Sequence, residues 1–178
     1  MTLPYFSFGF SALLLLAAGQ DLWKLRISNI FPIALIALYL VRAVFVGWQS
    51  DMWQNLAVFA LALSAGTFLF AKRWLGGGDV KLFAATALWF DFVAAPYLLV
   101  AITFGGALIA LVFIFMRRLL PAGLDEKTGW QSLKRRGPIP YGLAIAFGAI
   151  LCSQVYEFNP APQRSVKDIL VSVPLKLN

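Results

Sequence analysis

Six stretches of apolar residues, separated from one another by short polar segments, run along almost the whole chain. They extend from Leu3 to Gln20, Asn29 to Trp48, Trp53 to Phe70, Asp79 to Val93, Pro96 to Met116 and Ile139 to Glu157. A helix needs about 20 apolar residues to cross the ~30 Å hydrocarbon core of a bilayer. The pattern therefore predicts an all-α, polytopic membrane protein with about six transmembrane helices.

The fourth and fifth stretches need a break between them. Leu82 to Met116 contains a single charged residue, Asp91. As one helix this segment would be about 52 Å long, which is far more than the bilayer requires. Asp91 and Pro96 mark the predicted break, because proline lacks a backbone donor and disfavours helix in the residue before it. The fourth helix is then too short to span unless it starts earlier, which places Gly76 to Asp79 at or just inside the membrane interface.

The domain organisation predicted from this pattern is simple. Residues 1–157 form one membrane domain, and residues 158–178 form a C-terminal tail that is disordered or interfacial. The loop from Arg117 to Gly137 contains a predicted short interfacial helix around Gly129 to Lys134. The N-terminal stretch is predicted to be a retained helix, since no basic residue precedes it and no small-residue cleavage site leads into a polar domain.

Basic residues are distributed unevenly among the connecting segments, and this predicts the orientation. The segments after the first, third and fifth stretches contain Lys24, Arg26, Lys72, Arg73, Lys81, Arg117, Arg118, Lys127, Lys134, Arg135 and Arg136. The segments after the second and fourth contain Asp51 and Asp91 and no basic residue. Because basic loops remain in the cytoplasm, we expect the N-terminus and the C-terminal tail outside. The expected location is the cytoplasmic membrane, which the chain crosses several times.

Composition excludes several classes of protein. Apolar residues make up 61% of the chain and charged residues 13%, which is atypical of a soluble domain. The net charge of +7 resides in short gaps between apolar stretches and not on a polar surface, so a nucleic-acid partner is not expected. With no histidine and with Cys152 as the only cysteine, the chain has no Ser-His-Asp triad and no histidine-ligated or four-thiolate zinc site.

Two aspartates stand at the predicted cytoplasmic boundary. Asp21 ends the first helix and Asp79 begins the fourth, so the two carboxylates can meet at one depth. Each also has a simpler interpretation. Asp21 could be an interfacial charge beside Lys24 and Arg26, and Asp79 could accept hydrogen bonds from free donors at a helix N-terminus. Glycines at 76, 77 and 78 favour a functional role, because a backbone without side chains lets another segment approach closely.

A pair of aspartates in a partly dehydrated site supports a known chemistry. The two carboxylates cannot both ionise cheaply, so one keeps its proton and the pair titrates as a unit. The ionised member can take a proton from water, while the protonated member supports the oxyanion formed on a peptide carbonyl. This aspartic-protease arrangement needs neither a metal nor a cofactor, and we expect none.

Three segments of the chain resemble a known family. Asp21-Leu-Trp-Lys-Leu-Arg-Ile-Ser-Asn29, Gly76-Gly-Gly-Asp79-Val-Lys81-Leu82 and Pro140-Tyr-Gly142 occur in that order. Together they resemble the pattern of the type IV prepilin peptidases, the GxGD membrane aspartyl proteases. The small size of the chain is most similar to the short peptidases of tight-adherence (Flp) pilus systems.

The resemblance implies roles for particular residues and for partners. Asp21 and Asp79 correspond to the paired catalytic aspartates. Site-shaping or substrate-binding positions are Gly76, Gly77, Gly78, Lys81 and Asn29. The implied substrate is a prepilin with a short basic leader followed by an apolar helix in the bilayer, cut at the cytoplasmic face, and a pilus assembly machinery is an implied further partner. One departure is Ser28, which stands where the family has proline, although serine can still cap the second helix.

Two other classes of function remain open at this point. A small ion- or proton-coupled carrier could bind a cation or a proton at Asp79 beside a glycine-broken helix. A non-catalytic membrane subunit of a pilus or secretion assembly could instead pair its aspartates with Lys24, Lys81 or a partner chain.

Overall fold

The computed structural model describes residues 4–119 and 139–156, and this part of the chain consists of six helices without strands. The helices are α1 (Pro4–Lys24), α2 (Ile30–Val46), α3 (Met52–Ala71), α4 (Gly77–Ala87), α5 (Ala94–Leu119) and α7 (Tyr141–Val155). Each predicted apolar stretch overlaps one of them, so the all-α class is confirmed. The predicted helix around Gly129 to Lys134 and the tail over 158–178 lie outside the described residues.

Three helices are long and apolar enough to cross a bilayer on their own. They are the segments Tyr5–Lys24, Met52–Ala71 and Ala94–Met116, in α1, α3 and α5. α2 and α7 are shorter apolar helices of 17 and 15 residues. α4 has 11 residues and ends at Ala87, so it is shorter than the predicted stretch Asp79 to Val93. The helix ends at Ala87 because Leu88, Trp89 and Phe90 turn into the core, where all three are buried.

The predicted break between the fourth and fifth stretches is confirmed, with Asp91 as its centre. The Asp91 Oδ1 atom accepts hydrogen bonds from the backbone N–H groups of Val93, at 3.0 Å, and Ala94, at 2.8 Å. These donors lie at the start of α5 and would have no partner within that helix. Pro96 lies inside the first turn of α5, where proline is tolerated, and does not itself form the break.

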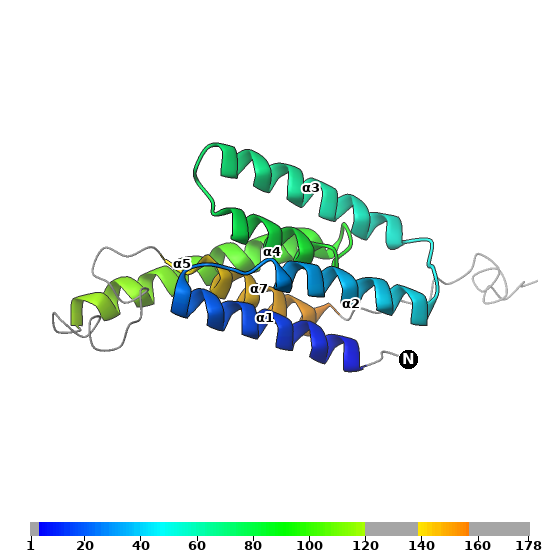
Figure 1. Ribbon diagram of the computed structural model, residues 1–178, viewed down its shortest axis with the longest axis horizontal. Helices are drawn as coiled ribbons and strands as arrows, with labels where there is room; N and C mark the ends of the chain where they lie inside the picture. Colours follow the sequence, from blue (N-terminus) through cyan, green and yellow to red (C-terminus); the bar gives the residue numbers. More distant parts are fainter. Residues whose placement is uncertain (1–3, 120–138, 157–178) are drawn as a thin grey trace, which may run out of the picture.

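The helices run up and down, so their ends gather at two ends of the bundle (Figure 1). One end collects the C-terminal ends of α1, α3 and α5 together with the N-terminal ends of α2, α4 and α7. Lys24, Arg26, Lys72, Arg73 and Lys81 therefore lie toward this end of the molecule. We refer to it as the basic end.

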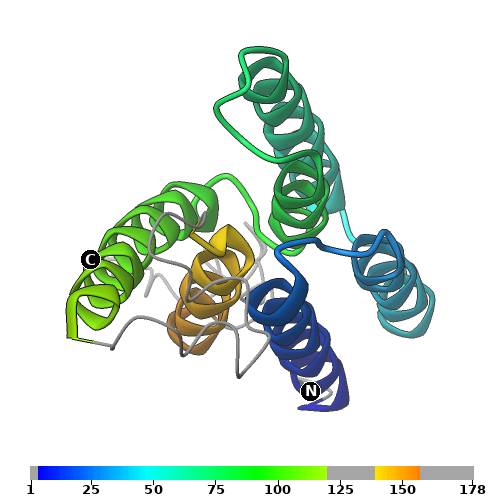
Figure 2. The same cartoon turned by 60° about the vertical axis from the view of Figure 1, so that its left-hand side comes forward.

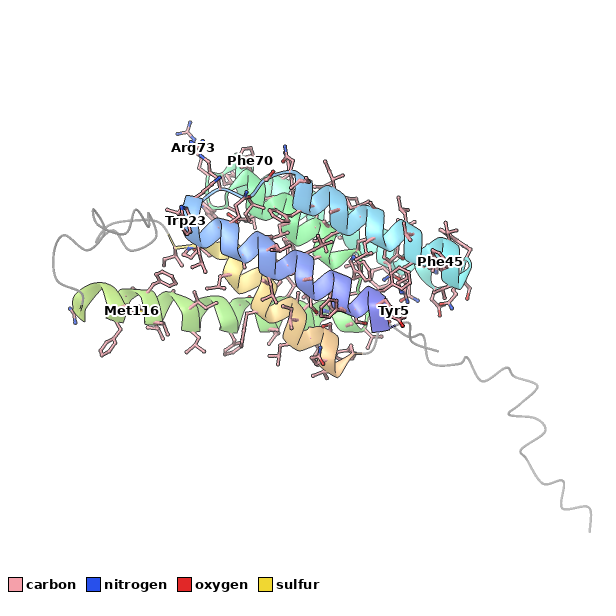
Figure 3. All side chains as sticks on the ribbon, turned by 60° about the horizontal axis from the view of Figure 1, so that its bottom comes forward. Tyr5, Trp23, Phe45, Phe70, Arg73 and Met116 are labelled. Atoms are coloured by element: carbon pink, nitrogen blue, oxygen red, sulfur yellow. The ribbon has the colours of Figure 1, made fainter. Side chains whose placement is uncertain are left out.

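α4 and α7 occupy the interior of the arrangement. α7 packs against α5 and α1, and α4 packs against α3, α2 and α7 (Figure 2). Most of α4 after its first turn is buried, including Val80, Leu82 and Thr86. By contrast, large apolar side chains such as Tyr5, Phe45 and Met116 are exposed on the outside (Figure 3). An apolar exterior around a small-residue interior is what a bilayer solvent favours.

Candidate active site

Asp21 lies in the last turn of α1 and is almost completely buried, with 4% of its surface exposed. Its Oδ2 atom accepts a hydrogen bond of 2.8 Å from the backbone N–H of Gly142. Gly142 is the second residue of α7, where backbone N–H groups have no partner within the helix. The carboxylate of α1 and the N-terminus of α7 therefore satisfy each other, and the positive end of the α7 dipole favours the negative charge.

Asp79 lies in the first turn of α4 and is half-buried. Its carboxylate accepts a hydrogen bond from the backbone N–H of Gly76, the residue that caps the helix. This is the carboxylate half of a capping box, in which the third helical residue reaches back to the cap. The expectation that Asp79 begins the fourth helix is thus met, with the helix starting two residues earlier.

The structure brings the two aspartates close enough to interact electrostatically. The pKa of Asp79 is raised from 3.8 to about 6, first by burial and second by the negative charge of Asp21, while the hydrogen bond from Gly76 opposes both. Neighbouring carboxylates that disfavour each other's ionisation hold a proton between them. Asp21 on α1 and Asp79 on α4 therefore influence each other's ionisation, and their role as a catalytic pair stays a prediction.

Two of the three consecutive glycines lie where a side chain would disturb the aspartates. A Cβ atom on Gly76 would lie 2.6 Å from the Oδ2 atom of Asp79. A Cβ atom on Gly78 would lie 3.2 Å from the Cβ and 3.3 Å from the backbone oxygen of Ile27, in the loop that follows α1. Gly76 thus leaves room for the carboxylate, while Gly78 lets the α4 N-terminus pack on the loop beside Asp21. A Cβ atom on Gly77 would instead lie 3.2 Å from the ring of Phe70 on α3.

Gly142 was not predicted from the sequence as a site residue, yet it contacts Asp21 most closely. A Cβ atom there would lie 2.9 Å from the Asp21 Oδ2 atom and 3.0 Å from the Cδ1 atom of Ile27. Ile27 therefore lies between Gly78 and Gly142 and joins the starts of α4 and α7. The only sequence signal for this role is the segment Pro140 to Gly142, which resembles the third part of the family pattern but opens a helix in any interpretation.

The loop between α1 and α2 is held by hydrogen bonds from both helices. The backbone N–H of Ser28 donates to the Gln20 Oε1 atom at 2.7 Å, which ties the loop to the residue before Asp21. The Ser28 hydroxyl accepts a long hydrogen bond of 3.4 Å from the backbone N–H of Ile30, but the cap position of α2 is Asn29 and not the expected Ser28. Leu25 ends α1 in a left-handed conformation with φ of 51°.

Asn29 and Lys81 lie together near the start of α2 and α4. The Lys81 Nζ atom donates a hydrogen bond of 3.0 Å to the Asn29 Oδ1 atom, across 52 residues of sequence. Asn29 occupies the cap position of α2, but its side chain makes no capping hydrogen bond. In the described ranges no group of three or more acidic, cysteine or histidine residues is placed to hold a metal ion.

Comparison with known proteins identifies the family. Residues 8–114 match the model of the type IV leader peptidase family, which covers more than half of the chain and includes both aspartates. The chain belongs to that family, a family of proteases that remove leader peptides from prepilins. No curated protein and no solved structure matches the chain.

Proposed function

We propose that this protein is an aspartic endopeptidase that uses Asp21 and Asp79 to remove the short basic leader from Flp-like prepilins at the cytoplasmic face of the membrane. The observation that supports the proposal is that the charge of Asp21 raises the pKa of Asp79, while Gly142 anchors the first carboxylate and Gly76 the second. Family membership supports the leader peptidase activity, while the aspartic mechanism rests on this geometry.

The proposed reaction follows from the protonation of the pair. The dyad holds one proton between its two carboxyl groups. The ionised carboxylate takes a proton from a water molecule as the water oxygen forms a bond to the scissile carbonyl carbon. The protonated carboxyl group donates a hydrogen bond to the carbonyl oxygen and so stabilises the oxyanion that forms there. When the C–N bond breaks, the leaving amine nitrogen takes a proton from the dyad, and one shared proton remains.

The proposed depth of cleavage rests on the position of the site along the bundle. Asp21 and Asp79 both lie toward the basic end, at the end of α1 and the start of α4. Because basic segments stay in the cytoplasm, this end is assigned to the cytoplasmic face. A prepilin with a basic leader in the cytoplasm and an apolar helix in the bilayer would present its cleavage site at this level. The short chain supports an Flp-type substrate by resemblance.

Purified protein in detergent, incubated with a panel of synthetic prepilin peptides, tests the proposal. Mass spectrometry should detect the free leader and the new N-terminus, and cleavage should persist in a metal chelator and after alkylation of Cys152. Asp21→Asn protein, purified in the same way, is the matched control. No cleavage of any peptide by folded protein, or cleavage abolished by the chelator, would contradict the proposal. A carrier or a structural subunit would give no cleavage in any condition.

A further inference from the structure

The peptide group between Ile27 and Ser28 lies between α1 and α4. Its N–H group donates the hydrogen bond of 2.7 Å to the Gln20 Oε1 atom on α1. Its carbonyl oxygen lies close to α4, since a Cβ atom on Gly78 would be 3.3 Å from it. No cis peptide bond occurs in the described part of the chain, and the N–H and C=O groups of a trans peptide point in opposite directions. One planar group therefore contacts α1 on one side and α4 on the other.

Both contacts are made by the residues next to the aspartates. Gln20 precedes Asp21 near the end of α1, and Gly78 precedes Asp79 in the first turn of α4. Because a peptide group is planar and resists rotation about its C–N bond, it acts as a spacer of fixed width between Gln20 and Gly78. The separation of the two carboxylates then depends on how firmly this peptide group is held.

The hydrogen bond to Gln20 is what holds it. The backbone N–H of Leu25 donates to the carbonyl oxygen of Asp21 at 2.8 Å and closes α1, and Leu25 then turns the chain with its φ of 51°. Within residues 4–119 and 139–156, neither the Ile27 carbonyl oxygen nor the Ser28 N–H has a further hydrogen-bond partner. The orientation of the peptide group therefore depends on the Gln20 side chain.

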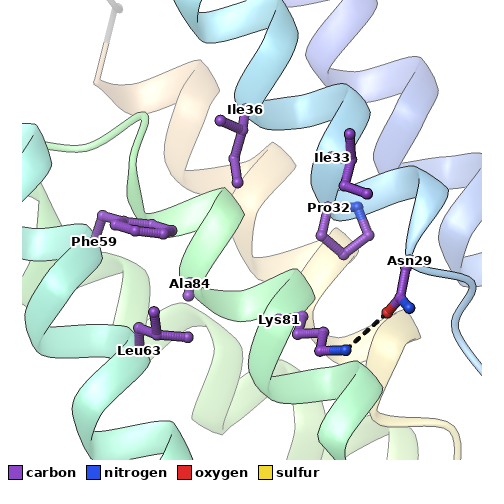
Figure 4. Close-up of a pocket in the computed structure, with 8 residues that line it drawn as sticks. All are labelled: Asn29, Pro32, Ile33, Ile36, Phe59, Leu63, Lys81 and Ala84. Atoms are coloured by element: carbon purple, nitrogen blue, oxygen red, sulfur yellow. Dashed lines mark hydrogen bonds between the residues drawn. The ribbon is translucent and has the colours of Figure 1, made fainter.

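The same loop contacts other helices of the site. A Cβ atom on Gly142 would lie 3.0 Å from the Cδ1 atom of Ile27, so this side chain packs on the start of α7. The Asn29 Oδ1 atom, at the end of the loop, accepts the hydrogen bond from Lys81 on α4 (Figure 4). Asn29 and Lys81 lie at one end of a groove of about 320 Å³ between α2, α3 and α4. A shift of the loop would thus be transmitted to both α4 and α7.

The residue type at position 28 accounts for the need for an acceptor. Ser28 stands where the family has proline, which has no N–H group and whose φ is fixed near −65°. Proline can therefore hold a loop without a hydrogen-bond partner. Serine leaves φ free to vary and adds an N–H group that requires an acceptor. Gln20 supplies this acceptor and so restores part of the restraint that proline would give.

Resting on the proposed function, we propose that Gln20 is a positioning residue, whose hydrogen bond to the Ser28 amide holds the Ile27–Ser28 peptide group and so sets the separation of Asp21 and Asp79. Gln20 acts through the loop and not on the substrate. Its loss should therefore lower kcat more than it raises KM, because misplacement of a catalytic group weakens binding of the transition state more than binding of the substrate.

Removal of the acceptor is the first test. Gln20→Leu keeps the approximate size of the side chain but cannot accept a hydrogen bond. For a synthetic prepilin peptide, kcat should fall about five- to tenfold while KM changes by about twofold at most. Gln54→Leu, in the first turn of α3 at the opposite end of the bundle, is the matched control and should retain kcat. Unaltered kcat in Gln20→Leu protein would overturn the inference.

Ser28→Pro tests whether Gln20 acts through the Ser28 amide. Among the described non-glycine residues positive φ occurs at Leu25 and Arg73, so Ser28 has the negative φ that proline requires, and it lies outside the helices. In the Ser28→Pro background the donor is gone, so adding Gln20→Leu should lower kcat no further. An equal fall of kcat in both backgrounds would show that Gln20 acts through another contact, which overturns the inference.

Hydrogen exchange gives a readout that does not depend on catalysis. In the purified full chain, mass spectrometry should show the Ser28 amide exchanging about tenfold faster in Gln20→Leu than in unaltered protein, with the Leu25 amide unchanged. Unchanged exchange at Ser28 would overturn the inference even if Ser28→Pro protein fails to fold. Faster exchange at Ser28, together with no cleavage of any peptide by the unaltered protein, would contradict the proposed function instead.

Discussion

Asp21 and Asp79 are held in different ways, although they act on one another. Asp21 is buried and fixed by an amide from another helix, α7, whereas Asp79 is half-exposed and bonded to the cap of its own helix. The amide and the α7 dipole favour the ionised form of Asp21. Burial, with the negative charge of Asp21 as a second cause, raises the pKa of Asp79 to about 6.

The raised pKa of Asp79 predicts how activity depends on pH. As pH rises through about 6, Asp79 loses its proton and the dyad no longer has an acid, so kcat/KM should fall on the alkaline side. The measurement is a pH profile of peptide cleavage by the purified protein, with Asp51→Asn protein as a control that should give the same profile. A descending limb that appears only several pH units higher would contradict this assignment of the proton.

The same pKa predicts an effect on stability. The folded protein binds the Asp79 proton more tightly than the unfolded chain does, so the stability associated with this group is present below pH 3.8 and is lost as pH rises to about 6. Asp79→Asn removes the titrating group, so its Tm should fall less between these pH values than that of the unaltered protein. Thermal unfolding in detergent, followed by circular dichroism, measures the difference. If Tm changes with pH in the same way for both proteins, this prediction is contradicted.

Gly142→Ala tests the contact between α7 and Asp21. The new Cβ atom would lie 2.9 Å from the Asp21 Oδ2 atom and 3.1 Å from its Cβ atom, so the carboxylate must move away from its amide donor. We expect kcat to fall about 10- to 100-fold, because displacement of a catalytic group by a fraction of an ångström is costly. Gly19→Ala, on an open face of α1 with nothing within 4 Å, should retain activity. Full activity of Gly142→Ala would contradict the role of this hydrogen bond.

The two aspartates could be predicted from the sequence, but not all of the residues that surround them. Asp21 and Asp79 could be predicted because charged residues at the ends of apolar stretches stand out in the sequence. The donor to Asp21 lies 121 residues away, in a helix whose start carries no charge and no unusual composition. Neither periodicity nor local spacing encodes such a contact, which depends on how α1 and α7 pack.

At the scale of elements, α4 differs most from what its sequence predicts. The break at Asp91 was predictable from the length of the apolar stretch and from the residue types in it. The helix end at Ala87 was not predictable, since Leu88 to Phe90 is as apolar as the helix itself. Tertiary contacts determine this end. The Trp89 Nε1–H group donates to the backbone oxygen of Leu35 on α2, at 3.3 Å, and its ring packs on Phe10 and Tyr39. Packing of one indole ring thus overrides the helical tendency of the segment.

Gly148→Ala tests the packing that holds α7 in place. A Cβ atom at Gly148 would lie 2.6 Å from the backbone nitrogen and 2.8 Å from the Cα atom of Ile102 on α5, so the backbones must separate. Overpacking of this kind costs about 1–3 kcal/mol, and Tm in detergent should fall by several degrees. Gly19→Ala should leave Tm unchanged or raise it slightly. An unaltered Tm for Gly148→Ala would show that α5 and α7 are not in this close contact.

At the scale of the whole molecule, the six described helices alternate in direction, and this arrangement predicts which ends are accessible from each side. Ser50, in the turn between α2 and α3, lies at the end opposite to Lys72, which follows α3. In a Cys152→Ser background, we expect Ser50→Cys to react with an impermeant thiol reagent applied from outside. Lys72→Cys should react only after the membrane is permeabilised. The reverse pattern would place the aspartates at the outer face and contradict the proposed orientation.

The overall architecture was largely predictable because bilayer thickness limits the length of each apolar stretch, so the number and order of helices follow from the sequence. The separation of α2 from α3 was not predictable, since it depends on both helices resting on α4. It is this separation that opens the groove next to Lys81. The shape of this groove, lined by residues of α2, α3 and α4, is therefore a property of packing.

The central claim is that Asp21 and Asp79 form one catalytic unit, and cleavage of a co-expressed prepilin by Asn variants tests it most directly. Asp21→Asn, Asp79→Asn and the double variant should each lose leader removal to a similar, non-additive degree, because either change removes an essential member of the dyad. Asp51→Asn should process normally, and membrane levels of every variant should be equal. Full processing of the prepilin by a well-expressed Asp21→Asn protein would contradict the claim.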